Sequence, residues 1–134
     1  MAGLYLLDTN IVIYLRRGVP SVVERLAAAG RQRVALPSLV VAELAYGVEK
    51  SLHPQRNRQV LERLLLEIAV RPWTHEAIWH YARHLHQLRT EGRVIGQMDL
   101  LIAAQALAED AVLVTNNTRE FERIEGLQIE NWLE

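Results

Sequence analysis

The sequence contains no cysteine. Disulfides, thiolate metal sites and cysteine nucleophiles are therefore excluded, and the composition is compatible with a reducing compartment. Lysine is almost absent as well, since Lys50 is the only one and arginine supplies the rest of the positive side-chain charge. Arginine suits bidentate contacts with phosphate, but a GC-rich genome produces the same bias. This feature alone does not indicate nucleic-acid binding.

Long apolar runs are also lacking, because none reaches the roughly 20 residues that span a bilayer. The first residues do not show the basic start and small-residue cleavage site of a signal peptide, so we expect a soluble, cytoplasmic protein with no membrane partner. The net charge of −1 gives no general attraction to nucleic acid, and such a surface has to come from local clustering. With half of its 134 residues hydrophobic, the chain is expected to form a single domain, 1–134.

Short apolar runs alternate along the chain with longer segments of helical periodicity. The apolar runs predict strands at residues 4–7, 34–36, 68–70 and 111–114, buried on both faces of a sheet, and a weak edge strand at 127–129. Apolar spacing, prolines and capping residues predict helices at 21–29, 38–48, 54–67, 76–90 and 98–109. This alternation implies a parallel central sheet with helices on both faces, so the predicted fold class is α/β, an α/β/α sandwich.

Acidic side chains occur where parallel sheets bind their ligands. Asp8 directly follows the first apolar run, at the carboxyl end of a predicted strand. Glu43 borders the apolar face of a predicted helix, and Asp99 lies at the start of another, where an acid is also a favourable cap. Glu120 comes shortly after the strand that ends at 114–115. The predicted topology allows several of these acids to converge on one sheet edge.

Each acid alone has an ordinary explanation as a turn residue, a half-exposed helix position, a cap or a surface charge. Crowded together, however, carboxylates repel one another and some become protonated unless a cation neutralises them. Mg²⁺ is the natural partner, since it takes oxygen ligands and keeps several waters for substrate phosphates. The pattern therefore predicts metal-assisted hydrolysis, in which the ion polarises a phosphoryl oxygen and lowers the pKa of a bound water.

Four short motifs, in this order, resemble those of the PIN-domain family, and in particular its VapC toxins. They are Leu7-Asp8-Thr9-Asn10, Ser38 with Glu43-Leu44 and Gly47, Asp99 with Ile102-Ala103-Ala104, and the run from Thr115 to Phe121. Together they extend from about residue 5 to residue 121, and the last run is especially typical of bacterial VapC toxins. The resemblance implies a PIN-like fold and a metal-dependent endoribonuclease that hydrolyses RNA phosphodiester bonds.

The resemblance also implies a role for each matched residue. Asp8, Glu43 and Asp99 correspond to the three catalytic acids that hold Mg²⁺ or Mn²⁺ in these ribonucleases. Glu120 corresponds to a fourth catalytic acid, which is an aspartate in many relatives, and the longer side chain leaves both direct and water-mediated metal contact open. Supporting roles are implied for the polar neighbours Asn10, Thr115, Asn116 and Asn117.

Partners are implied in the same way. Family members form homodimers and are blocked by a cognate VapB-type antitoxin that wraps around the toxin, and larger assemblies form with it. Related toxins cleave RNA hydrolytically and leave a 5′-phosphate, and some cut the anticodon loop of initiator tRNA. The sequence resembles that tRNA-cleaving branch, although the RNA target is the least transferable property.

Other side chains have competing interpretations. His80, His84 and His86 suggest a metal site, since His80 and His84 lie one helical turn apart. His80 and His84 lack the adjacent glutamate of helical zinc hydrolases, however, and we expect both to face solvent. Aromatic rings can stack on bases, but packing is the favoured interpretation for Trp73, Trp79 and Trp132.

Five arginines are candidates for contact with RNA phosphates: Arg16, Arg17, Arg89, Arg93 and Arg119. Arg119 is the first of them because it neighbours Glu120. For each of the five, exposure to solvent or contact with an antitoxin is an equally strong interpretation.

Three other functions are alternatives to a toxin ribonuclease. A phosphatase of the haloacid-dehalogenase type would use Asp8 as a nucleophile, but such enzymes carry a second acid two residues later, where this chain has Asn10. A non-catalytic RNA-binding or regulatory subunit has no need to crowd acids opposite a polyanion. A housekeeping RNA-processing nuclease of the same fold stays open, and a neighbouring antitoxin gene would separate it from a toxin.

Overall fold

In the computed structural model, which describes residues 3–134, five parallel strands form one sheet. The strand order is β3-β2-β1-β4-β5, so the first strand lies at the centre. The strands are β1 (Tyr5–Leu7), β2 (Val34–Pro37), β3 (Ala69–Arg71), β4 (Val112–Val114) and β5 (Gln128–Glu130). This arrangement confirms the predicted parallel sheet, with Gln128–Glu130 at one edge as expected.

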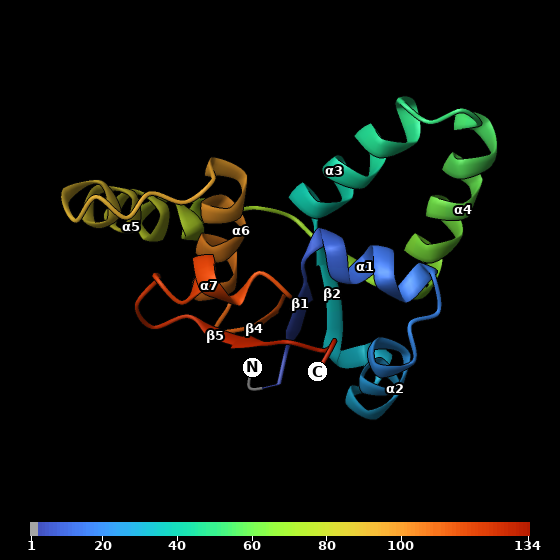
Figure 1. Cartoon of the computed structure of the whole chain (residues 1–134), viewed down its shortest axis with the longest axis horizontal. Helices are drawn as coiled ribbons and strands as arrows, with labels where there is room; N and C mark the ends of the chain where they lie inside the picture. Colours follow the sequence, from blue (N-terminus) through green and yellow to red (C-terminus); the bar gives the residue numbers. More distant parts are fainter. Residues whose placement is uncertain (1–2) are drawn as a thin grey trace.

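Helices flank the sheet from both sides (Figure 1). Helices α1 to α4 gather on one side of β1 and β2, and α5 to α7 lie on the other. Their bounds are α1 (Thr9–Arg16), α2 (Pro20–Ala29), α3 (Ser38–Glu49), α4 (Pro54–Glu67), α5 (Ile78–Thr90), α6 (Gln97–Ala108) and α7 (Thr118–Phe121). The α/β/α prediction is thereby confirmed. Within residues 3–134, none of these helices has the length and apolar character needed to cross a membrane.

Helices α1 and α7 and strand β3 differ from the sequence-based expectation, since neither helix was predicted. Helix α1 was not predicted, because its β-branched run Ile11-Val12-Ile13 favours strands as much as helices. The helix forms because the Asp8 side chain caps its first turn and because Ile11 and Val12 are fully buried. Strand β3 begins one residue later than predicted and is exposed along its length, since it is an edge strand with a single neighbour. Only Ile68, just before it, is buried.

The core places two strand ends at the same level. Leu7 of β1 pairs in register with Val114 of β4, and the Asp8 amide donates to the Val114 carbonyl at 2.9 Å. The residues that follow, Asp8 and Thr115, therefore emerge side by side at the carboxyl edge of the sheet. Both lie above a densely packed apolar layer in which Leu6, Leu36 and Leu113 have no exposed surface.

This central position predicts a large effect of truncating Leu6, which is fully buried in the middle strand. We expect Leu6→Ala to lower the free energy of unfolding by about 2–5 kcal/mol, because the lost burial is accompanied by a cavity. The matched control is Leu52→Ala at a side chain that is 94% exposed, where we expect a change within about 0.5 kcal/mol. Urea titration at one protein concentration measures both, and equal effects would contradict the assigned position of Leu6.

Candidate active site

Asp8 is the most buried of the four predicted acids, at 7% exposure. Its Oδ1 accepts a hydrogen bond from the Thr9 amide at 2.8 Å, and its Oδ2 accepts one from the Thr115 hydroxyl at 2.8 Å. Burial raises the pKa of Asp8 above its usual range, the two hydrogen bonds oppose that rise, and the charge of Glu43 adds to it. The carboxylate is thus fixed in orientation without being neutralised.

Thr115 connects Asp8 to the segment that follows β4. Its side chain is completely buried, and its hydroxyl donates to Asp8 while accepting from the Asn117 amide at 3.0 Å. The Asn117 side chain in turn donates to Oε2 of Glu120 at 2.8 Å. One continuous hydrogen-bonded chain therefore runs from the end of β1 through the end of β4 to α7.

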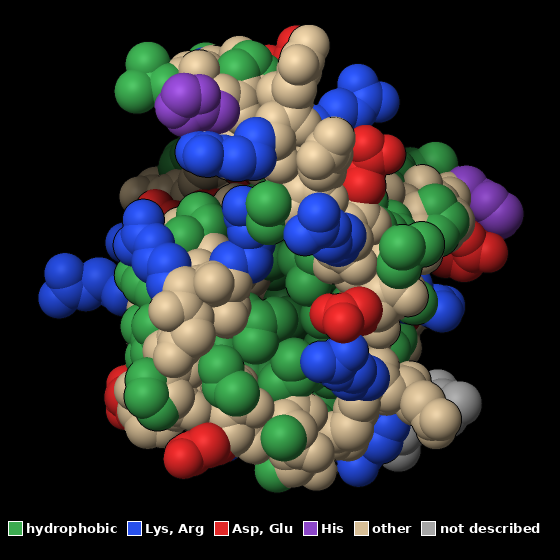
Figure 2. Space-filling view, turned by 90° about the vertical axis from the view of Figure 1, so that its right-hand side faces the viewer, with side chains coloured by type: hydrophobic (Ala, Val, Ile, Leu, Met, Phe, Trp, Pro, Cys, Tyr) green, Lys and Arg blue, Asp and Glu red, His purple; other side chains and the backbone are tan. Residues whose placement is uncertain are grey.

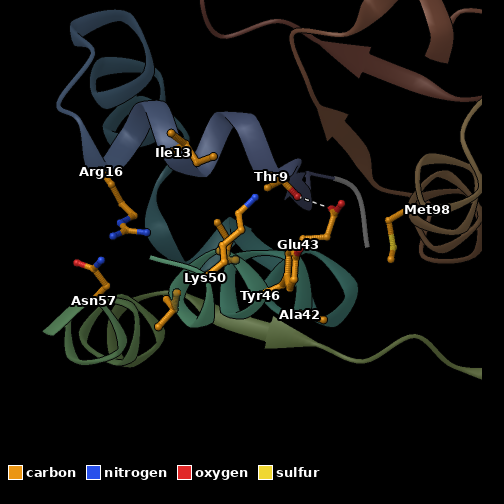
Figure 3. Close-up of a pocket in the computed structure, with 12 residues that line it drawn as sticks. Thr9, Ile13, Arg16, Ala42, Glu43, Tyr46, Lys50, Asn57 and Met98 are labelled. Carbon is orange, nitrogen blue, oxygen red and sulfur yellow. Dashed lines mark hydrogen bonds between the residues drawn. The ribbon is translucent and has the colours of Figure 1, made fainter. Parts of the chain in front are cut away.

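Glu43 enters the site from α3. The Thr9 hydroxyl donates to Oε1 of Glu43 at 2.6 Å, as the dashed line in Figure 3 shows. Thr9 was not singled out from the sequence as a supporting residue. The available signal was a hydroxyl directly after Asp8, at the start of a segment that folds as a helix.

Asp99 lies in the first turn of α6 and is half-buried. Burial, together with the neighbouring charge of Asp8, raises its pKa to about 7. A hydrogen bond with Glu120 and the charges of Glu120 and Glu43 raise it further in the same direction. This dependence shows that the structure brings all four predicted acids into one electrostatic neighbourhood.

No cationic side chain neutralises this neighbourhood. Among residues 3–134, none of the salt bridges formed by arginine, lysine or histidine involves Asp8, Glu43, Asp99 or Glu120. Hydroxyl and amide donors hold the carboxylates instead, and these donors leave the negative charge in place.

The donor set fits a hard divalent cation, because it consists of carboxylate oxygens with uncompensated charge. Within the described chain, no three acidic or histidine side chains are gathered closely enough to form a ready metal cage. That spacing is compatible with Mg²⁺, which retains several waters and is commonly held by one or two direct carboxylates. Asp8, with Glu43 and Asp99 on either side, is best placed to hold such an ion.

The remaining predicted site residues are distributed unevenly. Asn117 contacts Glu120, whereas Asn116 has a buried side-chain oxygen that accepts no hydrogen bond in the described structure. Asn10 is exposed, and its side chain makes no hydrogen bond to an acid among residues 3–134. Arg119 is exposed on α7 directly beside Glu120.

The histidines and tryptophans lie away from the acids. Burial and the charges of His80 and Arg83 lower the pKa of His84, and no third metal-ligating side chain joins this pair within residues 3–134. Trp132 is buried in the core, and Trp73 donates its Nε1 hydrogen to the Leu101 carbonyl, as packing residues do. Trp79 differs from the expectation of packing, since it is 69% exposed on α5.

The contact between Thr115 and Asp8 predicts a measurable pKa change. We expect Thr115→Val to raise the pKa of Asp8 above its value in the parent protein, because the hydroxyl bond that favours the carboxylate is lost. Thr115→Ser retains the hydroxyl, so we expect it to leave that pKa nearly unchanged. Carboxyl NMR titration without divalent ions measures both variants, and an equal pKa in valine and serine proteins would show that this hydrogen bond does not tune Asp8.

The raised pKa of Asp99 predicts how stability depends on pH without metal. The folded protein holds the Asp99 proton more tightly than the unfolded chain does, so stability from the protonated carboxyl is lost as the pH rises through about 7. In EDTA, we expect Asp99→Asn to exceed the parent in stability at pH 8 by roughly 1–2 kcal/mol, allowing for solvent screening of a half-exposed group. The difference should shrink toward pH 5. Urea unfolding at both pH values tests this, and a pH-independent difference would contradict it.

Comparison with known proteins agrees with this geometry. Residues 5–127 match the model of the PIN domain. The chain is 39% identical to ribonuclease VapC2 of Haemophilus influenzae, across 96% of this chain and 98% of that protein. It is 37% identical to the tRNA(fMet)-specific endonuclease VapC of Shigella flexneri, across 96% and 97% of the two chains.

Solved structures show the same relationship. One solved structure is that of VapBC2 from Rickettsia felis bound to a DNA fragment from the VapBC2 promoter. It contains a chain that superimposes on this protein with a TM-score of 0.90. The two chains are 37% identical, and the match covers 96% of this chain and 98% of the other. Sequence, fold and the position of the acids at the sheet edge agree: this chain belongs to the PIN-domain family and, within it, to the VapC ribonucleases.

Proposed function

We propose that this protein is a Mg²⁺-dependent endoribonuclease, with Mn²⁺ as an alternative ion, and that residues 1–134 act as a single catalytic domain. The observation that carries the proposal is the convergence of four carboxylates, none of which forms a salt bridge with a cationic side chain within residues 3–134. A folded protein maintains such repulsion at a stability cost, which a bound cation removes.

Asp8, Glu43 and Asp99 are proposed to hold the ion. When bound, it would polarise a phosphoryl oxygen and lower the pKa of a water ligand. The protein's part is positioning: Thr115 and the Thr9 amide fix the Asp8 carboxylate, and the Thr9 hydroxyl fixes Glu43. Preorganised carboxylates need no rearrangement when the RNA phosphate arrives, which favours in-line attack by water.

Glu120 is proposed as the fourth catalytic acid. Asn117 holds one of its oxygens, and its hydrogen bond with Asp99 places it beside the protonated form of that acid. In that position Glu120 can accept a hydrogen bond from the protonated Asp99 or from a water near it. A role through water rather than through direct coordination suits this peripheral contact.

The RNA substrate and the partners follow from the relatives. One of them is a tRNA(fMet)-specific endonuclease, so initiator tRNA is the first proposed substrate, cut in its anticodon loop. VapBC2 from Rickettsia felis is one structural neighbour, so we propose that this chain is the toxin of such a pair and that a VapB-type antitoxin restrains it. A homodimer and a cytoplasmic location complete the proposal.

The phosphatase alternative is not favoured by the geometry. Such an enzyme needs a second acid two residues after its nucleophile, and this chain carries Asn10 there. Asn10 is exposed, and within residues 3–134 its side chain makes no hydrogen bond to Asp8.

RNA cleavage by the purified chain tests the proposed function directly. With Mg²⁺ or Mn²⁺ and the antitoxin removed, we expect initiator tRNA to be cut to fragments with a 5′-phosphate, and EDTA to stop the reaction. Asp8→Asn, Glu43→Gln and Asp99→Asn should each lower the rate by about 100-fold or more, as loss of a preorganised electrostatic contact does. Glu120→Gln should have a smaller effect.

The matched control is Glu24→Gln, which alters an exposed acid on α2 that forms no salt bridge in the described structure. It should retain the parent rate. Calorimetric titration with Mn²⁺ separates two failures: an inactive protein that binds the ion has a different RNA target, whereas one that binds no ion does not use these carboxylates as proposed.

A further inference from the structure

A groove leads away from the acids between α1 and α3. It has a volume of about 690 Å³ and is lined from four helices, with Thr9 and Arg16 on α1, Lys50 at the end of α3, Asn57 on α4 and Met98 on α6. Thr9 and Glu43, joined by their hydrogen bond, lie at one end (Figure 3). Arg16 and Asn57 lie at the other. The groove is therefore continuous with the proposed active site.

The charge of this groove reverses along its length. Glu43 is the only acid that lines it, whereas Arg16 and Lys50 both contribute cationic side chains. Neither cation forms a salt bridge among residues 3–134, whereas five arginines elsewhere do: Arg25, Arg31, Arg58, Arg71 and Arg93. Figure 2 shows the right-hand side of Figure 1, where several basic side chains and an acidic one border a hollow with an apolar floor.

An aromatic ring stands beside the single lysine. Tyr46 is 66% exposed on α3, and the Lys50 ammonium lies 5.0 Å from the centre of its ring. The exposed ring is therefore accessible to a stacking partner. A ring next to uncompensated cations is the combination with which proteins bind single-stranded nucleic acid, by base stacking and phosphate contact.

Gly47 keeps the floor of the groove open. A Cβ built at this position meets no atom within 4 Å outside its own neighbours. A larger side chain could therefore project into the groove without displacing the core. Glycine also weakens a helix interior relative to alanine by about 1 kcal/mol, so its presence within α3 is better explained by the space it leaves than by helix stability.

We propose that this groove is the track for the RNA strand that enters or leaves the active site, with Arg16 and Lys50 on its phosphates and Tyr46 stacked on a base. The inference rests on the proposed ribonuclease function. The acids repel phosphates, so a substrate needs cations close by but outside the acid cluster. Uncompensated cations favour a polyanion over an apolar protein segment as the occupant of this groove.

RNA binding without cleavage tests this assignment. The probes are fluorescein-labelled initiator tRNA and an unstructured RNA of about 12 nucleotides, titrated with full-length Asp8→Asn protein and, in parallel, with the parent chain in EDTA. In the Asp8→Asn protein, an added Lys50→Gln or Arg16→Gln substitution should weaken RNA binding. Each should also reduce the slope of log affinity against log salt concentration by about 0.7, the value for one lost phosphate contact on a single strand. Tyr46→Leu should weaken binding about tenfold with little change in that slope.

Matched controls come from α5, on the far side of the molecule in Figure 1. Arg83→Gln removes an exposed cation that forms no salt bridge in the described chain, and Trp79→Leu removes an aromatic ring of similar exposure to Tyr46. Both should bind RNA as the parent does. Gly47→Leu should block the groove and weaken binding, whereas Gly47→Ala should not.

The outcomes separate this inference from the proposed function. If the parent chain cleaves RNA but the groove variants bind RNA with unchanged affinity and salt slope, the proposed RNA track is overturned and the ribonuclease assignment stands. This holds even if the groove variants lose binding to a protein partner such as the antitoxin. If α5 controls weaken binding as much as the groove variants, the track is also overturned. Absence of metal binding and of cleavage in the parent would instead refute the proposed function.

Discussion

The negative charges of Asp8, Glu43, Asp99 and Glu120 repel one another, and the fold holds them together against that repulsion. Burial, with the charges of the other three acids added to it, raises the pKa of Asp99 to about 7. The parallel pairing of β1 with β4 makes this possible, because the register of Leu7 with Val114 fixes where Asp8 and Thr115 emerge. The fully buried leucines below them give the strand ends little freedom to separate.

Neutral hydrogen-bond donors orient these carboxylates without cancelling their negative charge. Thr9, Thr115 and Asn117 each donate a hydrogen bond to a carboxylate, so the acids are oriented while their charge is preserved. An arginine or lysine in the same places would orient them equally well but would cancel the charge that attracts a cation. The burial of Thr115 is thus informative: a completely buried hydroxyl is retained because both of its hydrogen bonds, to Asp8 and from Asn117, are satisfied there.

The sequence predicts the parts of this structure that depend on local pattern. Apolar runs located the strands around Asp8 and Thr115, and parallel topology predicted that the acids would meet, which the charge coupling at Asp99 confirms. Helix α1 was missed because its β-branched residues have no clear local preference, and burial against the sheet decides the outcome. The bond from Thr9 to Glu43 was missed for a different reason. It joins residues 34 positions apart, and only the packing of α1 against α3 determines that they meet.

Helix α1 also explains how a chain of net charge −1 can present separate acidic and basic regions to one substrate. Its first turn carries Thr9 against Glu43, and its last residue is Arg16. At 1.5 Å per residue, seven residues separate these positions by about 10 Å. A cation in the last turn is favoured by the helix dipole, and an acid cap is favoured at the first, so the same polarity stabilises both ends. Because the helix is buried along Ile11 and Val12, the spacing of the backbone positions that carry Thr9 and Arg16 is set by secondary structure. Bulk charge therefore says little about RNA binding in this protein, whereas the position of each charge along one short helix says a great deal.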